Sequence, residues 1–210
     1  FAPKAAAILN ITPDHLNRHH TMANYIAAKE SIVKNQTRDD LCVLNYNDEV
    51  LRAFGKTLEQ KVVLFSSTET LDAGLYLQEN EILWARNGKT EHIISVEELN
   101  ILGAHNYENV MAAVALCDGM GVPMETIREG LRDFHAVEHR IEFVCKKNDI
   151  AFYNDSKGTN PDAAIKGICA MNRRTVLIGG GYDKESVYDE WIDSFDGKVK
   201  QLVLIGQTAK

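Results

Sequence analysis

The sequence predicts an α/β protein with two consecutive domains, each built around parallel strands. Short apolar runs alternate with helical patterns through most of the chain, and this alternation favours parallel strands joined by helices. In the middle, short strands flank Asn87-Gly88, a strong hairpin signal that predicts a small antiparallel meander. The strand and helix pattern then starts again, so we place a boundary near residues 135–139 and predict domains at 1–136 and 137–210.

The first domain begins with apolar runs typical of buried strands. These strands are predicted at residues 5–11, 41–46 and 61–66. Between the first two, a helix is predicted because apolar residues recur on one face, namely Met22, Tyr25, Ile26, Ile32 and Val33. Asn47 is a candidate cap for the next helix. The meander strands are predicted at 74–78, 81–86 and 90–95, and two further helices at 107–120 and 123–132.

The second domain repeats the alternation. Its strands are predicted at residues 140–145, 150–154, 175–178 and 201–205, and its helices at 161–171 and about 187–195. Pro161 suits the first position of a helix, and Asn160 suits the cap before it. This pattern predicts the opening half of an α/β domain.

Composition and charge exclude several classes of protein. The chain is 45% hydrophobic and 25% charged, which is typical of a soluble globular protein. A net charge of −7 argues against a surface that neutralises nucleic-acid phosphates. No apolar run approaches the roughly 18 residues that span a bilayer. We therefore expect a cytoplasmic monomer with no nucleic-acid partner and no membrane insertion.

The four cysteines are far apart, each inside an apolar segment, and form no C-x-x-C pair. They are Cys42, Cys117, Cys145 and Cys169. We interpret all four as reduced core residues of a cytosolic protein. The chain also lacks a starting Met and enters a predicted strand almost at once, so we expect a piece of a longer protein.

A polar stretch after the strand at 150–154 is the first candidate site. It runs Asn154-Asp155-Ser156-Lys157-Gly158-Thr159-Asn160. Ligands of open parallel sheets bind outside the carboxyl ends of strands, so an acid, a hydroxyl and a lysine there favour a site. A polar loop capped by Asn160 is an equally weighted alternative.

Lys29 lies in the middle of the apolar stripe of the first predicted helix. An unpaired charge there is costly, so the side chain must reach solvent, pair with an acid or lose its charge by chemistry. The loop Thr12-Pro13-Asp14-His15 precedes it and contains two residue types that bind metals. A structural role for this loop is the alternative.

Two glycine-containing segments are further candidates. Gly103-x-His105-Asn106-x-x-Asn109 opens a predicted helix, where side-chain amides can bind a base edge, although capping by Asn106 is an alternative. Gly179-Gly180-Gly181-Tyr182-Asp183-Lys184 would place Lys184 near Lys157 if the strands before them are neighbours. The phosphate loop G-x-x-x-x-G-K-[ST] occurs nowhere in the sequence.

Together these segments resemble the Mur ligase family, ATP-dependent enzymes that add amino acids to the cell-wall precursor UDP-N-acetylmuramic acid. The matching segments are NITPDHLNRH from Asn10, Tyr25-x-x-Ala28-Lys29-x-x-Ile32, Gly103-x-His105-Asn106-x-x-Asn109, His139-Arg140-x-Glu142 and NDSKGTNP from Asn154. The last segment is similar to that of the family member that adds D-glutamate.

The resemblance implies a central ATPase-type domain without its phosphate-loop strand, followed by a partial Rossmann-like domain. It implies ATP and Mg²⁺ as cofactors, and UDP-N-acetylmuramoyl-L-alanine and D-glutamate as substrates. ATP would phosphorylate the terminal carboxylate, and the amine of D-glutamate would then attack the acyl phosphate.

The resemblance also gives roles to individual residues. His15 matches a magnesium ligand, and Lys29 matches a lysine that carbon dioxide carbamylates, which would turn a costly cation into a metal-binding anion. The remaining matches are Asn106 and Asn109 for adenine, Arg140 and Asp155 for ATP, and Lys157, Thr159 and Lys184 for the amino acid or the phosphoryl group. Of these, His15, Lys29 and Lys157 are the expected catalytic residues.

Two departures from the family pattern matter. Asn17 replaces a usual aspartate, and we expect this change to be tolerated because it is not the ligand. The resemblance further implies that the UDP-binding domain, the phosphate loop and a magnesium-binding glutamate precede Phe1, so we expect an inactive fragment. The alternatives are a folylpolyglutamate synthase-like ligase and a non-catalytic nucleotide-binding module.

Overall fold

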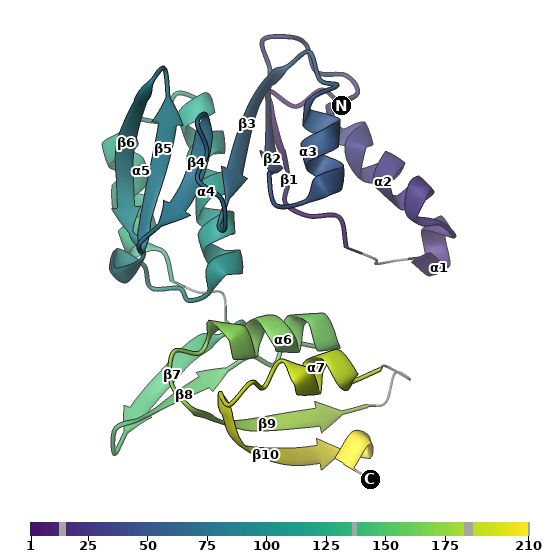
Figure 1. Ribbon diagram of the computed structural model, residues 1–210, viewed down its shortest axis with the longest axis vertical. Helices are drawn as coiled ribbons and strands as arrows, with labels where there is room; N and C mark the ends of the chain where they lie inside the picture. The colour runs from purple at the N-terminus through teal and green to yellow at the C-terminus, as the bar shows by residue number, and fades with distance from the viewer. Residues whose placement is uncertain (13–15, 136–137, 183–186, 210) are drawn as a thin grey trace. The chain divides into compact units, whose positions relative to one another are not determined.

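A computed structural model describes residues 1–12, 16–135, 138–182 and 187–209 (Figure 1). Contacts divide the chain into two compact units. The first comprises Phe1–Leu99 and His105–Phe134, and the second comprises Asn100–Ala104 and His135–Lys210. No helix in the described part of the chain is long and apolar enough to cross a membrane.

The first unit contains one six-stranded sheet with the strands in chain order. They are β1 (Ala5–Ile8), β2 (Leu41–Asn45), β3 (Lys61–Ser66), β4 (Gly74–Gln78), β5 (Glu81–Arg86) and β6 (Lys89–Ser95). Strands β1 to β4 pair in parallel, and β5 and β6 add antiparallel pairs. The predicted meander is therefore part of the same sheet as the parallel strands.

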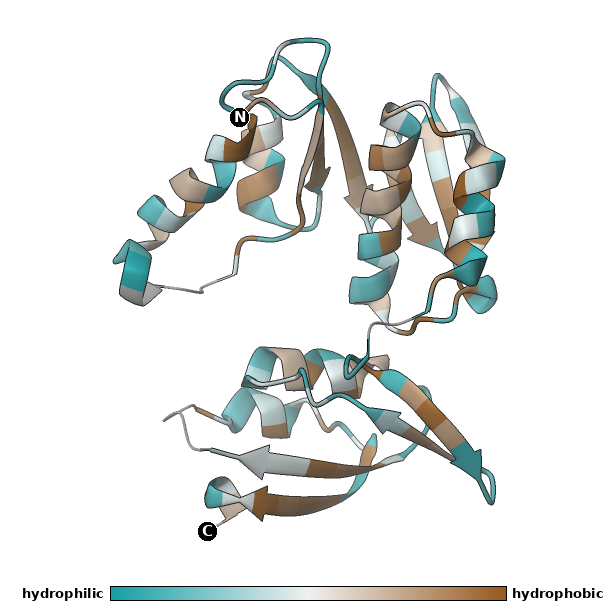
Figure 2. Cartoon of the chain, turned by 180° about the vertical axis from the view of Figure 1, so that it is seen from behind, coloured by the Kyte–Doolittle hydropathy of each residue, from teal (hydrophilic) through white to brown (hydrophobic). Residues whose placement is uncertain are grey.

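Helices accompany this sheet in the first unit, and the polar side chains of Asn45 and Ser66 at the ends of β2 and β3 are buried. They are α1 (Leu16–His19), α2 (Met22–Glu30), α3 (Glu49–Gly55), α4 (Ala104–Gly119) and α5 (Met124–Asp133), with short 3-10 turns at Ser31–Val33 and Val96–Glu98. Helices α4 and α5 cover one face of β4 to β6 in both views (Figures 1 and 2). Every residue of β2 is buried, so the core lies along the central strands.

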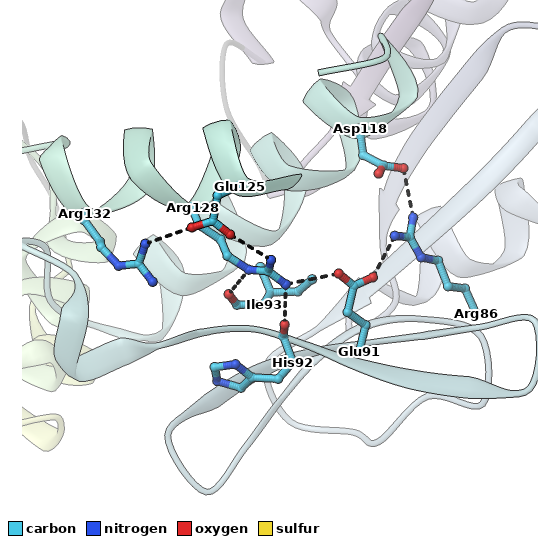
Figure 3. A network of polar contacts seen from close by, with 8 residues as sticks. All are labelled: Arg86, Glu91, His92, Ile93, Asp118, Glu125, Arg128 and Arg132. Atoms are coloured by element: carbon cyan, nitrogen blue, oxygen red, sulfur yellow. Dashed lines mark hydrogen bonds and ion pairs between the residues drawn. The ribbon is translucent and has the colours of Figure 1, made fainter. Parts of the chain in front are cut away.

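A network of hydrogen bonds and ion pairs connects the edge strand β6 to helix α5 (Figure 3). Arg128 on α5 donates to the carbonyl oxygens of His92 at 2.8 Å and Ile93 at 2.9 Å, and to Glu91 Oε1 at 3.1 Å. Glu91 also accepts from Arg86, which reaches Asp118 on α4. The network thus joins the hairpin to both helices that cover it.

The second unit contains two separate pairs of strands. Strands β7 (Glu142–Lys147) and β8 (Ile150–Asn154) are antiparallel, whereas β9 (Thr175–Gly181) and β10 (Val199–Gly206) are parallel. The helices are α6 (Pro161–Ala170) and α7 (Asp189–Asp193), and a 3-10 turn spans Gln207–Ala209. Apolar residues of β9 and β10 are exposed, among them Ile178 and Ile205, and both strands are hydrophobic along much of their length (Figure 2).

Several local predictions were wrong. The helix α3 is capped by Asp48, not Asn47, because the Asp48 carboxylate accepts from the backbone amides of Val50 and Leu51. Helix α4 begins at Ala104, so Asn106 lies inside its first turn and does not cap it. Helix α2 also ends early, at Glu30, so the last two residues of the predicted stripe fall in the following 3-10 turn, where Val33 is buried and Ile32 is exposed.

The prediction that the cysteines are core residues holds for one of the four. Cys42 is fully buried on β2, and burial raises the pKa of its thiol to about 12. Cys117, Cys145 and Cys169 are free but exposed, because they lie on outward positions of α4, β7 and α6. Their apolar neighbours in sequence therefore did not indicate burial.

Candidate functional site

Lys29 lies in the last turn of α2, a helix that Thr21 caps by accepting from the Asn24 amide at 3.2 Å. Its ammonium group donates to the carbonyl oxygen of Asn10 at 2.8 Å and lies 4.9 Å from the centre of the Tyr25 ring. The sequence predicts that this lysine reaches solvent, pairs with an acid or loses its charge. In the structure its amine extends beyond the apolar stripe and donates to a backbone carbonyl. The loop after β1 and helix α2 are thereby joined at the predicted site.

The described residues contain no ready-made cluster of metal-binding side chains. They contain no group of three or more His, Cys, Asp or Glu side chains placed to hold a metal ion. The predicted ligand His15 lies outside the described residues, and an ammonium group such as that of Lys29 donates hydrogen bonds and cannot bind a cation. We therefore assign no chemical step to magnesium.

The start of α4 brings the two predicted adenine-binding amides together. The Asn109 side-chain amide donates to Asn106 Oδ1 at 3.4 Å, one turn earlier on the helix. Gly103 precedes the helix with a φ of +97°, a conformation that favours glycine. An exposed pair of amides one turn apart offers both donors and acceptors to the edge of a base.

The loop after β8 packs against the segment that leads into β7. Asp155 Oδ1 accepts from the backbone amide of Ile141 at 3.1 Å, and the Lys157 amide donates to the His139 carbonyl at 2.9 Å. These bonds bring Arg140, Asp155 and Lys157 into one neighbourhood. Asn160 caps α6 by accepting from the Ala163 amide at 2.8 Å, as the capped-loop alternative predicted. This cap is compatible with a site in the same stretch.

The position of the Asp155 carboxylate also explains why Gly158 and Gly167 have no side chain. A Cβ at Gly158 would come within 2.9 Å of Asp155 Oδ2, and one at Gly167 within 2.8 Å. The segment facing this carboxylate is unusual, because Ile141 is buried with a φ of +47°, which is uncommon for a β-branched residue. A backbone conformation of this kind persists only where the surroundings fix it.

The structure does not bring Lys157 and the triple-glycine segment together in the predicted way. Strand β8 pairs with β7, and β9 pairs with β10, so β8 and β9 are not neighbours in a sheet. Gly179 and Gly180 lie inside β9, where they make room for the Trp191 ring and for the Ile205 carbonyl oxygen. Lys184 itself lies outside the described residues.

Sequence reasoning missed a group of polar residues that joins the carboxyl ends of β2 and β3 to helix α4. They are Asn45, Asn47, Ser66, Ser67 and Glu108, and hydrogen bonds connect all five. The available signal was an asparagine directly after the apolar run of β2, where a ligand-binding edge is expected. Glu108 gave no signal beyond its place between Asn106 and Asn109.

Two domain families match the chain. Residues 1–117 match the Mur ligase middle domain, and residues 139–210 match the glutamate ligase domain of Mur ligases. The chain is 55% identical over 208 residues to the UDP-N-acetylmuramoylalanine--D-glutamate ligase of Lachnoclostridium phytofermentans. That match covers 99% of the chain and 46% of the relative, so the chain spans about half the length of the curated relatives it matches.

Solved structures with this fold include two proteins named as ligases. A UDP-N-acetylmuramoylalanyl-D-glutamyl-2,6-diaminopimelate--D-alanyl-D-alanyl ligase from Acinetobacter baumannii matches with a TM-score of 0.70 and 22% identity, covering 99% of this chain and 47% of that one. A MurF ligase from Thermotoga maritima in complex with ADP matches with a TM-score of 0.68 and 16% identity, covering 99% and 53%. At these identities the likeness concerns the fold alone.

Proposed function

Because the chain belongs to the Mur ligase family, we propose that it forms part of an ATP-dependent ligase that joins D-glutamate to UDP-N-acetylmuramoyl-L-alanine. The observation that carries this proposal is the 55% identity, over nearly the whole chain, to a protein named for that reaction. The proposed activity belongs to a protein about twice as long, so the 210 residues alone are expected to be inactive.

The proposed reaction has two steps. The terminal carboxylate of UDP-N-acetylmuramoyl-L-alanine attacks the γ-phosphorus of ATP, which releases ADP and leaves an acyl phosphate. The amine of D-glutamate then attacks the acyl carbon, phosphate leaves, and an amide forms as the amine loses a proton. Both steps place negative charge close together, so the protein must supply donors and cations along the path.

The described residues suit particular tasks in this reaction. Asn106 and Asn109 offer a pair of amides for adenine at the start of α4. Lys29 is held beside the loop after β1, where its proposed carbamate would replace an ammonium by an anion. On the second unit, Arg140 and Asp155 would bind ATP.

Three assignments complete the proposal. Lys157 and Thr159, which share a tight turn through the Thr159 amide and the Lys157 carbonyl at 2.9 Å, would face the amino acid or the phosphoryl group. His15 and Lys184 belong to the proposal through the family resemblance. Magnesium is proposed on the same ground, and the boundary between the two domains is proposed near residue 136.

Phosphate release tests the proposal in two proteins. The full-length protein that carries this chain is expected to release phosphate only when ATP, UDP-N-acetylmuramoyl-L-alanine and D-glutamate are all present. The 210-residue chain under the same conditions is expected to release none. Turnover by the short chain would contradict the fragment proposal, and activity of the long protein on a folate substrate instead would contradict the assigned reaction.

A further inference from the structure

Glu108 on α4 is the common acceptor of a polar network at the carboxyl edge of the sheet in the first unit. Its Oε1 accepts from the Ser67 hydroxyl at 2.6 Å and from the Asn47 amide at 3.1 Å. Its Oε2 accepts from the Asn45 amide at 3.2 Å. Three donors from the ends of β2 and β3 therefore converge on one carboxylate that lies between Asn106 and Asn109.

The orientation of Asn45 is fixed by its other contacts. Its Nδ2 also donates to the Leu9 carbonyl at 3.0 Å, while its Oδ1 accepts from the Asn47 backbone amide at 2.9 Å. Turning the amide over would lose these bonds at once, and the side chain is buried. Asn45 can therefore present only donors to Glu108 and to the loop after β1.

That loop is held at three successive residues. Leu9 is held through its carbonyl by Asn45, Asn10 through its carbonyl by Lys29 at 2.8 Å, and Ile11 through its amide by Asp48 Oδ2 at 2.6 Å. Asp48 uses its other carboxylate oxygen to cap α3. The backbone beside Lys29 is thus fixed from β2, α2 and the start of α3.

We propose that Glu108 is a positioning residue that couples the nucleotide-binding start of α4 to the loop beside Lys29, through Asn45 and Leu9. This inference rests on the proposed function, which gives Asn106, Asn109 and Lys29 their roles. In this role Glu108 acts through its hydrogen bonds to Asn45, Asn47 and Ser67, and it sets the spacing between the base end and the phosphoryl-transfer end of the site.

The charge of Glu108 is required because every partner donates. In Glu108→Gln, the new NH₂ group must face either Asn45 or the pair formed by Asn47 and Ser67. In both orientations this donor meets another donor. Leaving a half-buried donor unsatisfied in this way is expected to weaken nucleotide binding about tenfold to a hundredfold. Glu129→Gln on α5 is the matched control, since Glu129 is exposed in the same unit.

The compensating variant is N45D combined with E108Q. The single change N45D sets a carboxylate against Glu108 and is expected to be at least as damaging as E108Q. In the double variant the amide of E108Q can donate to the carboxylate of N45D, while its carbonyl keeps Asn47 and Ser67 as donors. Both variants lack the Asn45 donor to the Leu9 carbonyl, so nucleotide binding is expected to recover relative to N45D alone but to stay weaker than in the wild type.

The test measures equilibrium binding of a fluorescent ATP analogue and steady-state kinetics in the full-length protein. E108Q is expected to raise the Kd of the analogue and the KM for ATP about tenfold or more and to lower kcat, with the KM for the UDP substrate unchanged. A variant that is only less folded would lower kcat and leave both KM values at the wild-type level, and that result would overturn the proposal.

The outcomes separate this inference from the proposed function. Unchanged ATP binding in E108Q, or a double variant no better than N45D, overturns the positioning role even if the wild type is an active ligase. A wild type that binds the analogue but forms no amide overturns the proposed reaction, while the binding comparison still decides the role of Glu108. A wild type that does not bind the analogue overturns both.

Discussion

Replacing Arg128 by methionine is expected to destabilise the first unit by about 3 kcal/mol. Strand β6 contains a bulge, because the register with β5 shifts between Ile82 and Leu83 and leaves Ile93 without a partner on β5. The guanidinium of Arg128 donates to the carbonyl oxygens of Ile93 and its neighbour His92, so it replaces the missing strand contacts (Figure 3).

The magnitude follows from the number and exposure of these bonds. A hydrogen bond from a charged donor contributes about 1.5–3 kcal/mol, and the lower value applies because the Arg128 side chain is 21% exposed and water replaces part of the loss. Two such bonds give the expected 3 kcal/mol. The ion pair with Glu91 adds at most about 1 kcal/mol.

Arg132, one turn later on the same helix, is the matched comparison. Its side chain is 40% exposed and pairs with Glu98 at 2.7 Å and Glu125 at 3.9 Å, with no bulge carbonyl among these contacts. Arg132→Met is therefore expected to cost clearly less than Arg128→Met.

Urea unfolding measures both changes. Trp84 on β5 reports on the first unit, and a Trp191→Phe background removes the signal of the second unit. If Arg128→Met lowers the free energy of unfolding by no more than Arg132→Met does, the bulge contacts do not stabilise the hairpin.

Three other predictions concern titration, reactivity and backbone packing. Hydrogen bonds from the Thr37 amide and from Lys4 lower the pKa of Asp40 to about 2. The ionised Asp40 carboxylate therefore contributes fully to stability above its ordinary pKa near 4, and this contribution is lost as the pH falls toward 2. The stability gap between wild type and Asp40→Asn, measured by urea unfolding, should narrow between pH 4 and pH 2, and a constant gap would contradict this. Iodoacetamide at pH 8 should label Cys117, Cys145 and Cys169 in the folded chain, whereas labelling of Cys42 before unfolding, detected by mass spectrometry, would refute its burial. Gly180→Ala should cost at least about 3 kcal/mol, because φ is +122° and the new Cβ would lie 2.1 Å from the Ile205 carbonyl oxygen; Gly181→Ala, with no atom within 4 Å, should cost less, and equal thermal shifts would contradict this account.

Local signals in the sequence predicted much of the fold. The bounds of β3 and β8 match the prediction, and Asn87 and Gly88 both have positive φ, as the predicted hairpin turn requires. Asn160 and Pro161 begin α6 as expected. These features depend on residues adjacent in sequence, which explains why sequence alone was sufficient.

Features that depend on distant contacts were not predicted. An apolar run indicates a strand but does not show whether other elements bury that strand. Cys145 was therefore predicted to lie in a core, although β7 is largely exposed. The triple-glycine segment was expected to follow the strand predicted at 175–178, yet its glycines lie inside β9, next to Trp191 and Ile205. The hydrogen bonds from Asn45 to Leu9 and Glu108 span 36 and 63 residues, and no local pattern encodes such contacts.

The candidate site shows the same division. Motifs of adjacent residues named Lys29, Asn106, Asn109 and Asp155 as candidates, and the structure brings Asn106 close to Asn109 and Asp155 close to the segment of Arg140. The residues that hold these groups in place were found only from the folded chain. Asn47, expected as a helix cap, belongs to that supporting network instead.

The most direct test of the central claim is the identity of the amino acid that the full-length protein joins to UDP-N-acetylmuramoyl-L-alanine. Mass spectrometry of the product, with ATP and an equimolar mixture of D-glutamate, L-glutamate, L-lysine and diaminopimelate, should detect the D-glutamate amide alone. The Lys29→Ala variant should form almost none of it. Preferential incorporation of another amino acid, or full activity without Lys29, would contradict the account.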